Sequence, residues 1–228
     1  MSAPDDPEVW VGPVVDGGES RPVIRRDVQF IGSVWAIVSD VVDFGEVSVT
    51  RDIQLHPGAV AVIALDDDDR VLLIRQYRHP VGMFLFEPPA GLLDVPGEPA
   101  EQTAARELAE EAGLVADDWH VLVDMLNSPG GSSEAIRIYL ARDLRPLPGG
   151  RPRTGEAEEA HLPQAWVDLD EACDLVLSGR ISSPHGVAGV LAAVASRESG
   201  WTGLRPAAAP WPVRDHLISH DRIFLRAK

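Results

Sequence analysis

Cysteine is nearly absent from the sequence: Cys173 is the only one among 228 residues. A single thiol cannot form an intrachain disulfide, which excludes the small disulfide-stabilised folds of secreted proteins. No apolar run is long enough to cross a bilayer. The start, Met1 to Asp6, has neither the basic flank nor the apolar stretch of a secretory signal. We therefore expect a cytoplasmic protein that does not associate with membranes.

Positive charge is also scarce, with 20 Lys and Arg against 36 Asp and Glu, for a formal net charge of −16. Nucleic acids and anionic lipid surfaces bind proteins mainly through lysine and arginine, so neither is expected as a partner. A small phosphorylated ligand remains compatible with this charge, because bound cations and a few local arginines can reverse the field inside one cleft.

The length and the 45% hydrophobic content allow one core with a small accessory element. Pro, Gly and acidic residues are concentrated in the first twenty positions, which predicts disorder there. The segment with Trp201 and Trp211 is rich in proline, and its pattern is compatible with contact to the body or to a partner. The predicted division is a disordered N-terminus (1–20), an N-terminal β element (21–56), a main domain (57–199) and a tail (200–228).

Hydrophobic periodicity predicts an α+β fold. Between Val28 and Ile53, apolar runs interrupted by glycines indicate two or more antiparallel strands. Gly58 to Leu65 and Val71 to Tyr77 are predicted as a hairpin around the turn Asp66 to Asp69. Further strands are expected at 119–126, 135–141 and 165–169, and further helices at 169–177, with Cys173 facing the core, and from Pro184 onward.

One helix carries an unusual group of acids. Pro99 is expected at the first helical position, and good helix formers follow it as far as Ala112. Gly113 then ends the helix. Because helical neighbours are three and four positions apart, the acids can share one face while an apolar stripe packs against a sheet. The acids are Glu107, Glu110 and Glu111, and the stripe is Ala104, Leu108 and Ala112.

A solvated acidic surface is the alternative reading of this helix. Like charges on one face destabilise a helix unless something neutralises them, and magnesium prefers carboxylate oxygens together with water and substrate phosphate. Arg106, the terminating Gly113 and the Gly- and Pro-rich loop before the helix are not required by a surface helix. The combination therefore favours a metal site.

These residues resemble a known motif. Arg106 to Leu114, with Glu98 eight residues before Arg106, is similar to the Nudix box, G-x5-E-x7-R-E-U-x-E-E-x-G-U. Six residues rather than five separate Gly91 from Glu98, so the loop carries one extra residue. The resemblance implies a Nudix α/β/α sandwich with a mixed sheet, plus the N-terminal antiparallel β element.

The resemblance also implies roles for the box. Glu107 and Glu111 would bind Mg²⁺ or Mn²⁺, Glu110 would add a ligand or a water-mediated contact, and the backbone carbonyl of Ala90 would complete the set. Arg106 would orient the glutamates through charge-assisted hydrogen bonds.

Segments outside the box resemble the ADP-ribose pyrophosphatase branch of the family. They are 56–62, 75–78, 87–91 and 128–134, with Pro129 sixteen residues after Gly113. Taken singly, each reads as a strand end or a turn. The resemblance implies that substrate contacts come from Arg78, Gly130, Gly131 and Glu134.

The implied reaction is hydrolysis of ADP-ribose to AMP and ribose 5-phosphate. The polar loop 154–160 matches the mobile loop that carries the branch's catalytic base, with Glu159 the better match and Glu158 its alternative. A disordered acidic loop without a catalytic role is the other reading.

The branch is also homodimeric, with N-terminal strands exchanged between subunits. By resemblance, Phe30 to Ile53 would serve that exchange and Arg51 would reach the partner's substrate. The competing functions are hydrolysis of another nucleoside diphosphate derivative, such as a nucleotide sugar or a dinucleotide, and non-catalytic binding of ADP-ribose.

Overall fold

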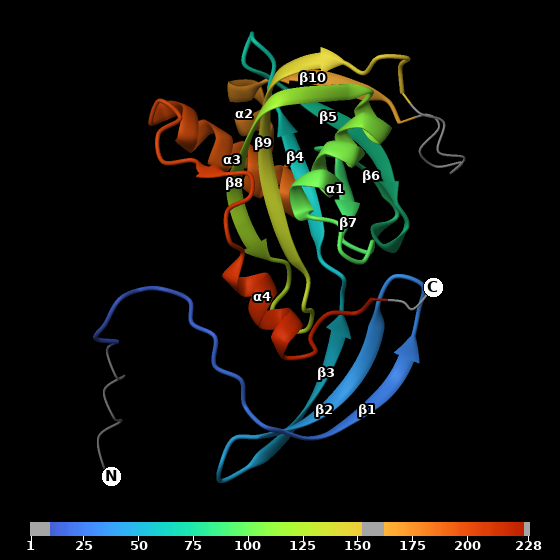
Figure 1. Ribbon diagram of the computed structural model, residues 1–228, viewed down its shortest axis with the longest axis vertical. Helices are drawn as coiled ribbons and strands as arrows, with labels where there is room; N and C mark the ends of the chain where they lie inside the picture. Colours follow the sequence, from blue (N-terminus) through green and yellow to red (C-terminus); the bar gives the residue numbers. More distant parts are fainter. Residues whose placement is uncertain (1–9, 152–161, 226–228) are drawn as a thin grey trace.

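The computed structural model describes residues 10–151 and 162–225. Figure 1 shows a main body of strands and helices, with a separate three-stranded sheet below it. That N-terminal sheet consists of β1 (Val23–Ile31), β2 (Ala36–Asp43) and β3 (Ser48–Leu55), in the antiparallel order β1-β2-β3. Residues 10–20 precede it as an exposed segment without regular structure.

The body contains two sheets. The larger has the order β11-β8-β9-β4-β7 and is mixed, because β4 pairs with β9 in parallel and with β7 in antiparallel. Its strands are β4 (Ala59–Ala64), β7 (Ala90–Leu92), β8 (Leu114–Leu126), β9 (Ala135–Pro146) and β11 (Arg205–Pro206). The smaller sheet has the order β10-β5-β6, from β5 (Arg70–Arg78), β6 (Met83–Glu87) and β10 (Gln164–Asp168).

Helices cover both faces of the larger sheet. Strand β4 is apolar along almost its whole length because alternate residues enter different cores. Ala61 and Ile63 pack toward α2 (Leu169–Leu177) and α3 (Pro184–Glu198). Val60 and Val62 pack in the core that contains the apolar stripe of α1 (Ala100–Glu107) and the following turn. The predicted α+β architecture with a mixed sheet is therefore observed.

Several predicted elements are confirmed, among them the helices at 169–177 and from Pro184, and Cys173 packs half-buried against the first core. The predicted strands on either side of the turn at Asp66 to Asp69 are observed, but they do not pair along their length as a hairpin would. β4 and β5 enter different sheets, and their adjoining ends are linked by a Leu65–Val71 bridge and by the bond from the Asp66 amide to the Arg70 carbonyl. The Asp66 carboxylate accepts hydrogen bonds from the amides of Asp68 and Arg70. These bonds stabilise the turn itself but do not pair the two strands with each other.

The C-terminal tail carries a helix that the sequence did not predict, α4 (Pro212–Ser219), and it packs on the body. Trp211 is buried in the same core as α1. Arg222, beyond α4, donates to the carboxylate of Asp40 on β2 at 2.8 Å. In Figure 1 this segment lies between the body and the N-terminal sheet.

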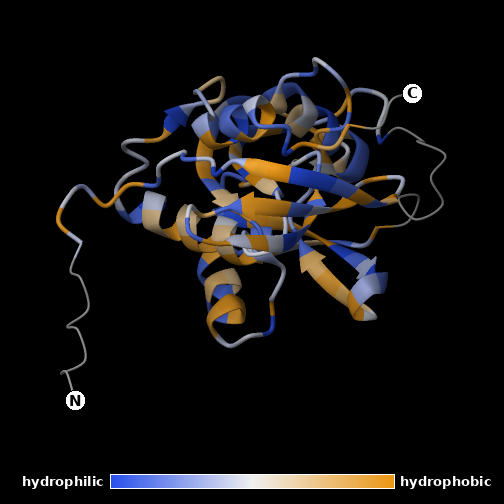
Figure 2. Cartoon of the chain, turned by 90° about the horizontal axis from the view of Figure 1, so that it is seen from below, coloured by the Kyte–Doolittle hydropathy of each residue, from blue (hydrophilic) through white to orange (hydrophobic). Residues whose placement is uncertain are grey.

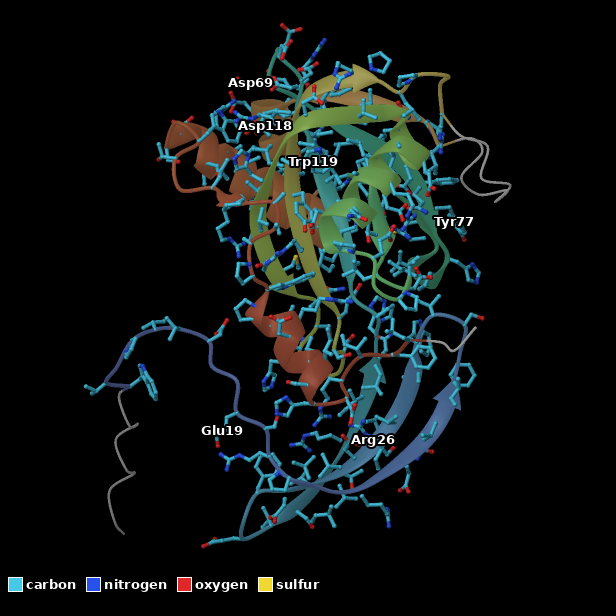
Figure 3. All side chains as sticks on the ribbon, in the orientation of Figure 1. Glu19, Arg26, Asp69, Tyr77, Asp118 and Trp119 are labelled. Carbon is cyan, nitrogen blue, oxygen red and sulfur yellow. The ribbon has the colours of Figure 1, made fainter. Side chains whose placement is uncertain are left out.

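Asp40 is the single charge among the alternating buried residues of β2, and it is fully buried. Arg26 donates to it at 2.7 and 2.8 Å, and Arg222 provides a third bond. Figure 3 shows Arg26 on the N-terminal sheet, where its guanidinium also reaches the carbonyl of Asp221 at 3.0 Å. The bond from Arg26, together with the charges of both arginines, outweighs burial and lowers the pKa of the Asp40 carboxyl.

Asp40→Asn is expected to lower the free energy of unfolding by about 2 kcal/mol at neutral pH, the size of a charge-assisted hydrogen-bond loss. Since the folded pKa of Asp40 is lowered, its stabilisation is complete above the unfolded value of about 3.9 and is lost as pH falls through the folded value. Urea denaturation at several pH values should therefore show the difference between wild type and variant shrinking in acid. Asp27→Asn, whose pair with Arg25 is exposed, is the control. A gap that stayed constant with pH would contradict the assignment.

Candidate active site

The acidic helix is built around one arginine. Arg106 donates to Glu107 at 2.7 Å, to Glu110 at 3.1 Å and to both oxygens of Glu98 at 3.2 Å. The bond to Glu98, with the charges of Glu107 and Glu98, outweighs burial and raises the pKa of the Arg106 guanidinium. The same bond lowers the pKa of the Glu98 carboxyl. Arg106 therefore keeps its charge and fixes three acids in place.

The helix differs in detail from the prediction. Pro99 is the N-cap rather than the first helical residue, and the last turn, η2 (Leu108–Ala112), has the wider hydrogen bonding of a π-helix. Gly113 ends it in the left-handed conformation with φ of 68°, as expected for a helix-terminating glycine. Such π turns are frequent at functional sites.

Strand β7 contacts the two buried glutamates, Glu107 and Glu111, and we call this contact surface of Ala90 and Gly91 the β7 seat. The amide of Ala90 donates to the Glu111 carboxylate at 2.9 Å. Gly91 lies directly against Glu107: a Cβ at position 91 would stand 2.1 Å from its carboxyl carbon. Gly91 thus keeps its place in the site despite the extra residue in the loop that follows it. Both glutamates are buried, and each is held against the backbone of one short strand.

These residues fit a hard divalent cation. Within residues 10–151 and 162–225, no group of three or more Asp, Glu, His or Cys side chains is arranged so that it could hold a metal ion by itself. Magnesium, however, is commonly held by one or two carboxylates together with water and substrate phosphate. Glu107 and Glu111, beside the Ala90 backbone and with Glu110 in the adjacent position, provide that kind of donor set.

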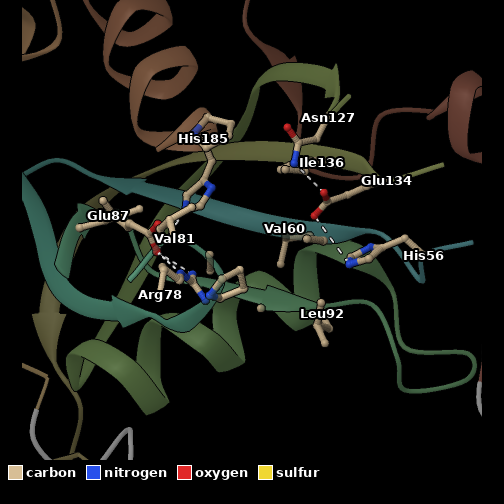
Figure 4. A pocket seen from close by; sticks show the side chains of 16 residues that line it. His56, Val60, Arg78, Val81, Glu87, Leu92, Asn127, Glu134, Ile136 and His185 are labelled. Carbon is tan, nitrogen blue, oxygen red and sulfur yellow. Dashed lines mark hydrogen bonds and ion pairs between the residues drawn. The ribbon is translucent and has the colours of Figure 1, made fainter. Parts of the chain in front are cut away.

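A cleft of about 380 Å³ opens beside β7. Ala90 and Gly91 line it, so the strand that seats the glutamates is also one wall of the cleft. Apolar side chains of Val60, Leu92 and Ile136 contribute to its lining. Figure 4 shows two polar groups in the cleft, one around Glu87 and the other around Glu134.

The first group ties Arg78 to Glu87. Arg78 donates to Glu87 at 2.9 and 2.5 Å, and His185, at the start of α3, lies 3.7 Å from the same carboxylate. Burial raises the pKa of the Glu87 carboxyl, but His185 and Arg78 together outweigh it, and the net shift is downward. The family resemblance predicted that Arg78 contacts a phosphate of the substrate. The structure places Arg78 at the cleft, with its guanidinium held by Glu87, and its contact with a phosphate stays a prediction.

The second group orients Glu134. Asn127 donates to one carboxylate oxygen at 2.6 Å, and Nε2 of His56 lies 3.7 Å from the other. Nδ1 of His56 accepts the amide of Gly58 at 3.1 Å, so the ring proton belongs on Nε2, facing Glu134. Burial lowers the pKa of His56 against the opposing charge of Glu134, so a neutral imidazole is favoured. Glu134 thus lines the cleft, and its contact with the substrate stays a prediction.

The other predicted substrate residues lie elsewhere. Arg51, Gly130 and Gly131 line a second groove of about 460 Å³, together with residues of α4. The cleft and this groove share a loop, because Glu134 lines the cleft and 129–133 line the groove. Glu158 and Glu159 lie outside the described residues.

Sequence reasoning assigned no role to His56, Asn127 or His185, which all line the cleft. His56 was visible only as part of a strand-opening segment. The sequence feature that could have singled out His56 is the Pro-Gly pair that follows it. Gly58 has a φ of 87°, a backbone conformation that favours glycine. No local pattern marks Asn127 or His185: Asn127 donates to Glu134 from the other end of a loop, and His185 faces Glu87, which lies far away in the sequence.

Comparisons with known proteins agree with this geometry. Residues 55–186 match the family described as NUDIX domain. The chain is 45% identical over 189 residues to an ADP-ribose pyrophosphatase of Mycobacterium tuberculosis, covering 82% of this chain and 89% of that protein. It is 36% identical over 166 residues to an ADP-ribose pyrophosphatase of Bacillus subtilis, covering 72% of this chain and 86% of that one.

A solved structure of an ADP compounds hydrolase superposes with a TM-score of 0.68 at 24% identity, covering 82% of this chain and 99% of that structure, which supports the fold. The helix with its arginine-held glutamates, the seat on β7 and the family match together confirm the resemblance of 98–114 to the Nudix box. The chain belongs to the Nudix family of hydrolases.

Proposed function

We propose that the protein hydrolyses the pyrophosphate of ADP-ribose, consuming one water and releasing AMP and ribose 5-phosphate. The observation that carries this proposal is the seating of Glu107 and Glu111 on β7, a strand that also walls the cleft. The ADP-ribose pyrophosphatases that resemble the chain over most of its length support the choice of substrate.

Glu107, Glu111 and the Ala90 carbonyl would hold Mg²⁺ or Mn²⁺, with Glu110 contributing a direct or water-mediated contact. When bound, the cation supplies neutralising charge for the pyrophosphate and a water of lowered pKa. Arg106 keeps the acids oriented, while Glu134 is fixed to accept hydrogen bonds from substrate hydroxyls. Glu87 holds Arg78 at the cleft, where its remaining N–H donors can reach a phosphate.

Substrate identity is tested with a panel of ADP-ribose, nucleotide sugars and dinucleotides in magnesium, with identification of the products. ADP-ribose should give the highest kcat/KM, with AMP and ribose 5-phosphate as products. A higher value for a nucleotide sugar or a dinucleotide would assign another substrate to the same residues. Binding of ADP-ribose without turnover would identify a non-catalytic module.

Glu159 is proposed as the base that positions or deprotonates the attacking water. Glu159→Gln should lower kcat by about a hundredfold, the scale of general-base contributions, with little change in magnesium affinity. Glu158→Gln is the matched comparison, one position away. Loss of kcat in Glu158→Gln alone would move the role to Glu158, and normal kcat in both would place the base outside this loop.

We also propose a homodimer that uses the N-terminal sheet. Ile24, Val28, Phe30 and Ile31 on β1 are each more than half exposed, and single-chain contacts leave this apolar surface uncovered. Figure 2 views the molecule from this end and shows hydrophobic and hydrophilic stretches on the strands. By family resemblance the strands of 30–53 exchange between subunits, which would bring Arg51 to the partner's substrate.

Light scattering should therefore report a dimer for the wild type and a monomer for the double variant Val28→Glu, Phe30→Glu. Val14→Glu, at a still more exposed position outside the sheet, should remain dimeric. A monomeric wild type at micromolar concentration would exclude the proposal.

A cytoplasmic location is proposed from the single, half-buried Cys173. In the part of the chain that the structure describes, no helix is both long enough and apolar enough to span a membrane.

A further inference from the structure

The C-terminal segment, residues 205–222, contacts both the catalytic body and the N-terminal sheet. On the body, β11 pairs with β8, and Arg137, almost fully buried, donates to the carbonyls of Ala209 and Pro210 at 2.6 and 2.9 Å. The Arg137 guanidinium also lies 4.6 Å from the centre of the Trp211 ring. These contacts fix the first half of the segment to the catalytic body.

The second half of the segment reaches the N-terminal sheet. Arg214 on α4 donates to the carbonyl of Pro57, between β3 and β4, at 2.7 Å. Arg222 then joins Arg26 on the fully buried Asp40. The segment therefore spans from the catalytic body to the middle of β2 through charge-assisted bonds, which are among the stronger polar contacts.

The same segment forms one wall of the groove that contains Arg51. β3 contributes Arg51 to Ile53, the loop contributes 129–133, and the C-terminal segment contributes His216, Leu217 and Arg222. On the opposite side, β3 meets the loop through two backbone bonds, Gln54 amide to Gly131 carbonyl and Ser133 amide to Gln54 carbonyl. Ser133 also accepts the amide of His56, which leads into the catalytic cleft.

We infer that the C-terminal segment is a positioning element for substrate binding. The segment is anchored on the catalytic body, and through the bonds of Arg222 to Asp40 and of Arg214 to the Pro57 carbonyl it holds β3, and with it Arg51, at a fixed place beside the 129–133 loop. Arg222 is a positioning residue that acts through Arg51. The inference rests on the proposed function, because Arg51 is taken as a substrate contact. It adds a role for residues 205–222, which lie beyond the 55–186 match to the NUDIX domain.

The test is steady-state kinetics with ADP-ribose and magnesium. Arg222→Leu should raise KM about tenfold, comparable to the loss of an outer contact that orients a binding group, with kcat nearly unchanged. Arg222→Lys, which keeps a charge for Asp40, should recover most of the affinity. Arg142→Gln is the control, because Arg142 bonds Asp118 within the body at 3.0 and 2.8 Å and lies outside residues 205–222.

A double-mutant cycle with Arg51→Ala separates positioning from a general loss of structure. If Arg222 acts through Arg51, Arg222→Leu should raise KM no further in the Arg51→Ala background. Additive effects on KM, or a fall in kcat equal to the fall in kcat/KM, would overturn the inference. If Arg222→Leu does not fold at the assay temperature, Arg214→Gln breaks the bridge at its other anchor and gives the same comparison.

Hydrogen exchange gives a readout that does not depend on the substrate. In Arg222→Leu, amides of β3 and of 129–133 should exchange faster than in wild type, while those of β4 and β9 stay unchanged. If the wild type fails to hydrolyse ADP-ribose, the proposed function fails, and the exchange experiment still decides the positioning role. Unchanged exchange in β3 would refute it.

Discussion

Replacing Glu111 by glutamine is expected to lower kcat for ADP-ribose by at least about a hundredfold while leaving the fold intact. Loss of a cation ligand removes several kcal/mol of transition-state stabilisation, and each 1.36 kcal/mol is a factor of ten. The fold should survive because glutamine keeps an oxygen that can accept the Ala90 amide, the bond that holds position 111 on β7.

This prediction is checked by kcat with magnesium and by thermal unfolding of the same preparation. Glu101→Gln is the matched control, because Glu101 is an acid of the same helix that lies in its first turn and outside the proposed cation ligands. Near wild-type turnover in Glu111→Gln would remove the metal-site assignment, and with it the proposed chemistry. A large drop in Tm would instead show that Glu111 is chiefly structural.

Gly91→Ala is expected to have the next largest effect on turnover. A methyl group at position 91 would stand 2.1 Å from the Glu107 carboxyl carbon, so that carboxylate must move. Because it is the end of a flexible side chain, the backbone can stay in place and the cost falls on the geometry of the site. Displacement of a reacting group by about 1 Å can cost on the order of a hundredfold in rate.

The measurement is kcat together with the magnesium concentration that gives half-maximal rate, and both should worsen. Gly17→Ala, where an added Cβ meets nothing within 4 Å, should leave both unchanged. An active Gly91→Ala with normal magnesium dependence would mean that Glu107 tolerates another position and is not a ligand.

The sequence was sufficient to predict the catalytic helix because its signals are local. Arg106, Glu107, Glu110 and Glu111 lie within two turns, and Gly113 ends the helix through its own backbone conformation. The family resemblance then supplied the fold and the expectation, still untested, that the Ala90 carbonyl binds the metal. The structure added that Ala90 holds Glu111 through its amide and that Gly91 makes room for Glu107.

Contacts between distant residues could not be predicted in the same way. The turn at Asp66 to Asp69 looks like a hairpin turn, but pairing of β5 with β6 and β10 depends on strands far along the chain. Arg78 is held by Glu87 on the neighbouring strand, a pairing that depends on the register between β5 and β6. Helix α4 could not be predicted because it is short and its sequence has no clear amphipathic pattern. None of its residues is fully buried in the structure.

The burial of Trp211 has a consequence for the order of folding during synthesis. Its indole completes the core beneath α1, although the chain reaches it only after every other fully buried residue of that core has been made. A growing chain must therefore leave this apolar surface open until the ribosome has released residues beyond α4. Nascent chains that stall earlier should expose it, and we expect them to depend on chaperones or to be degraded.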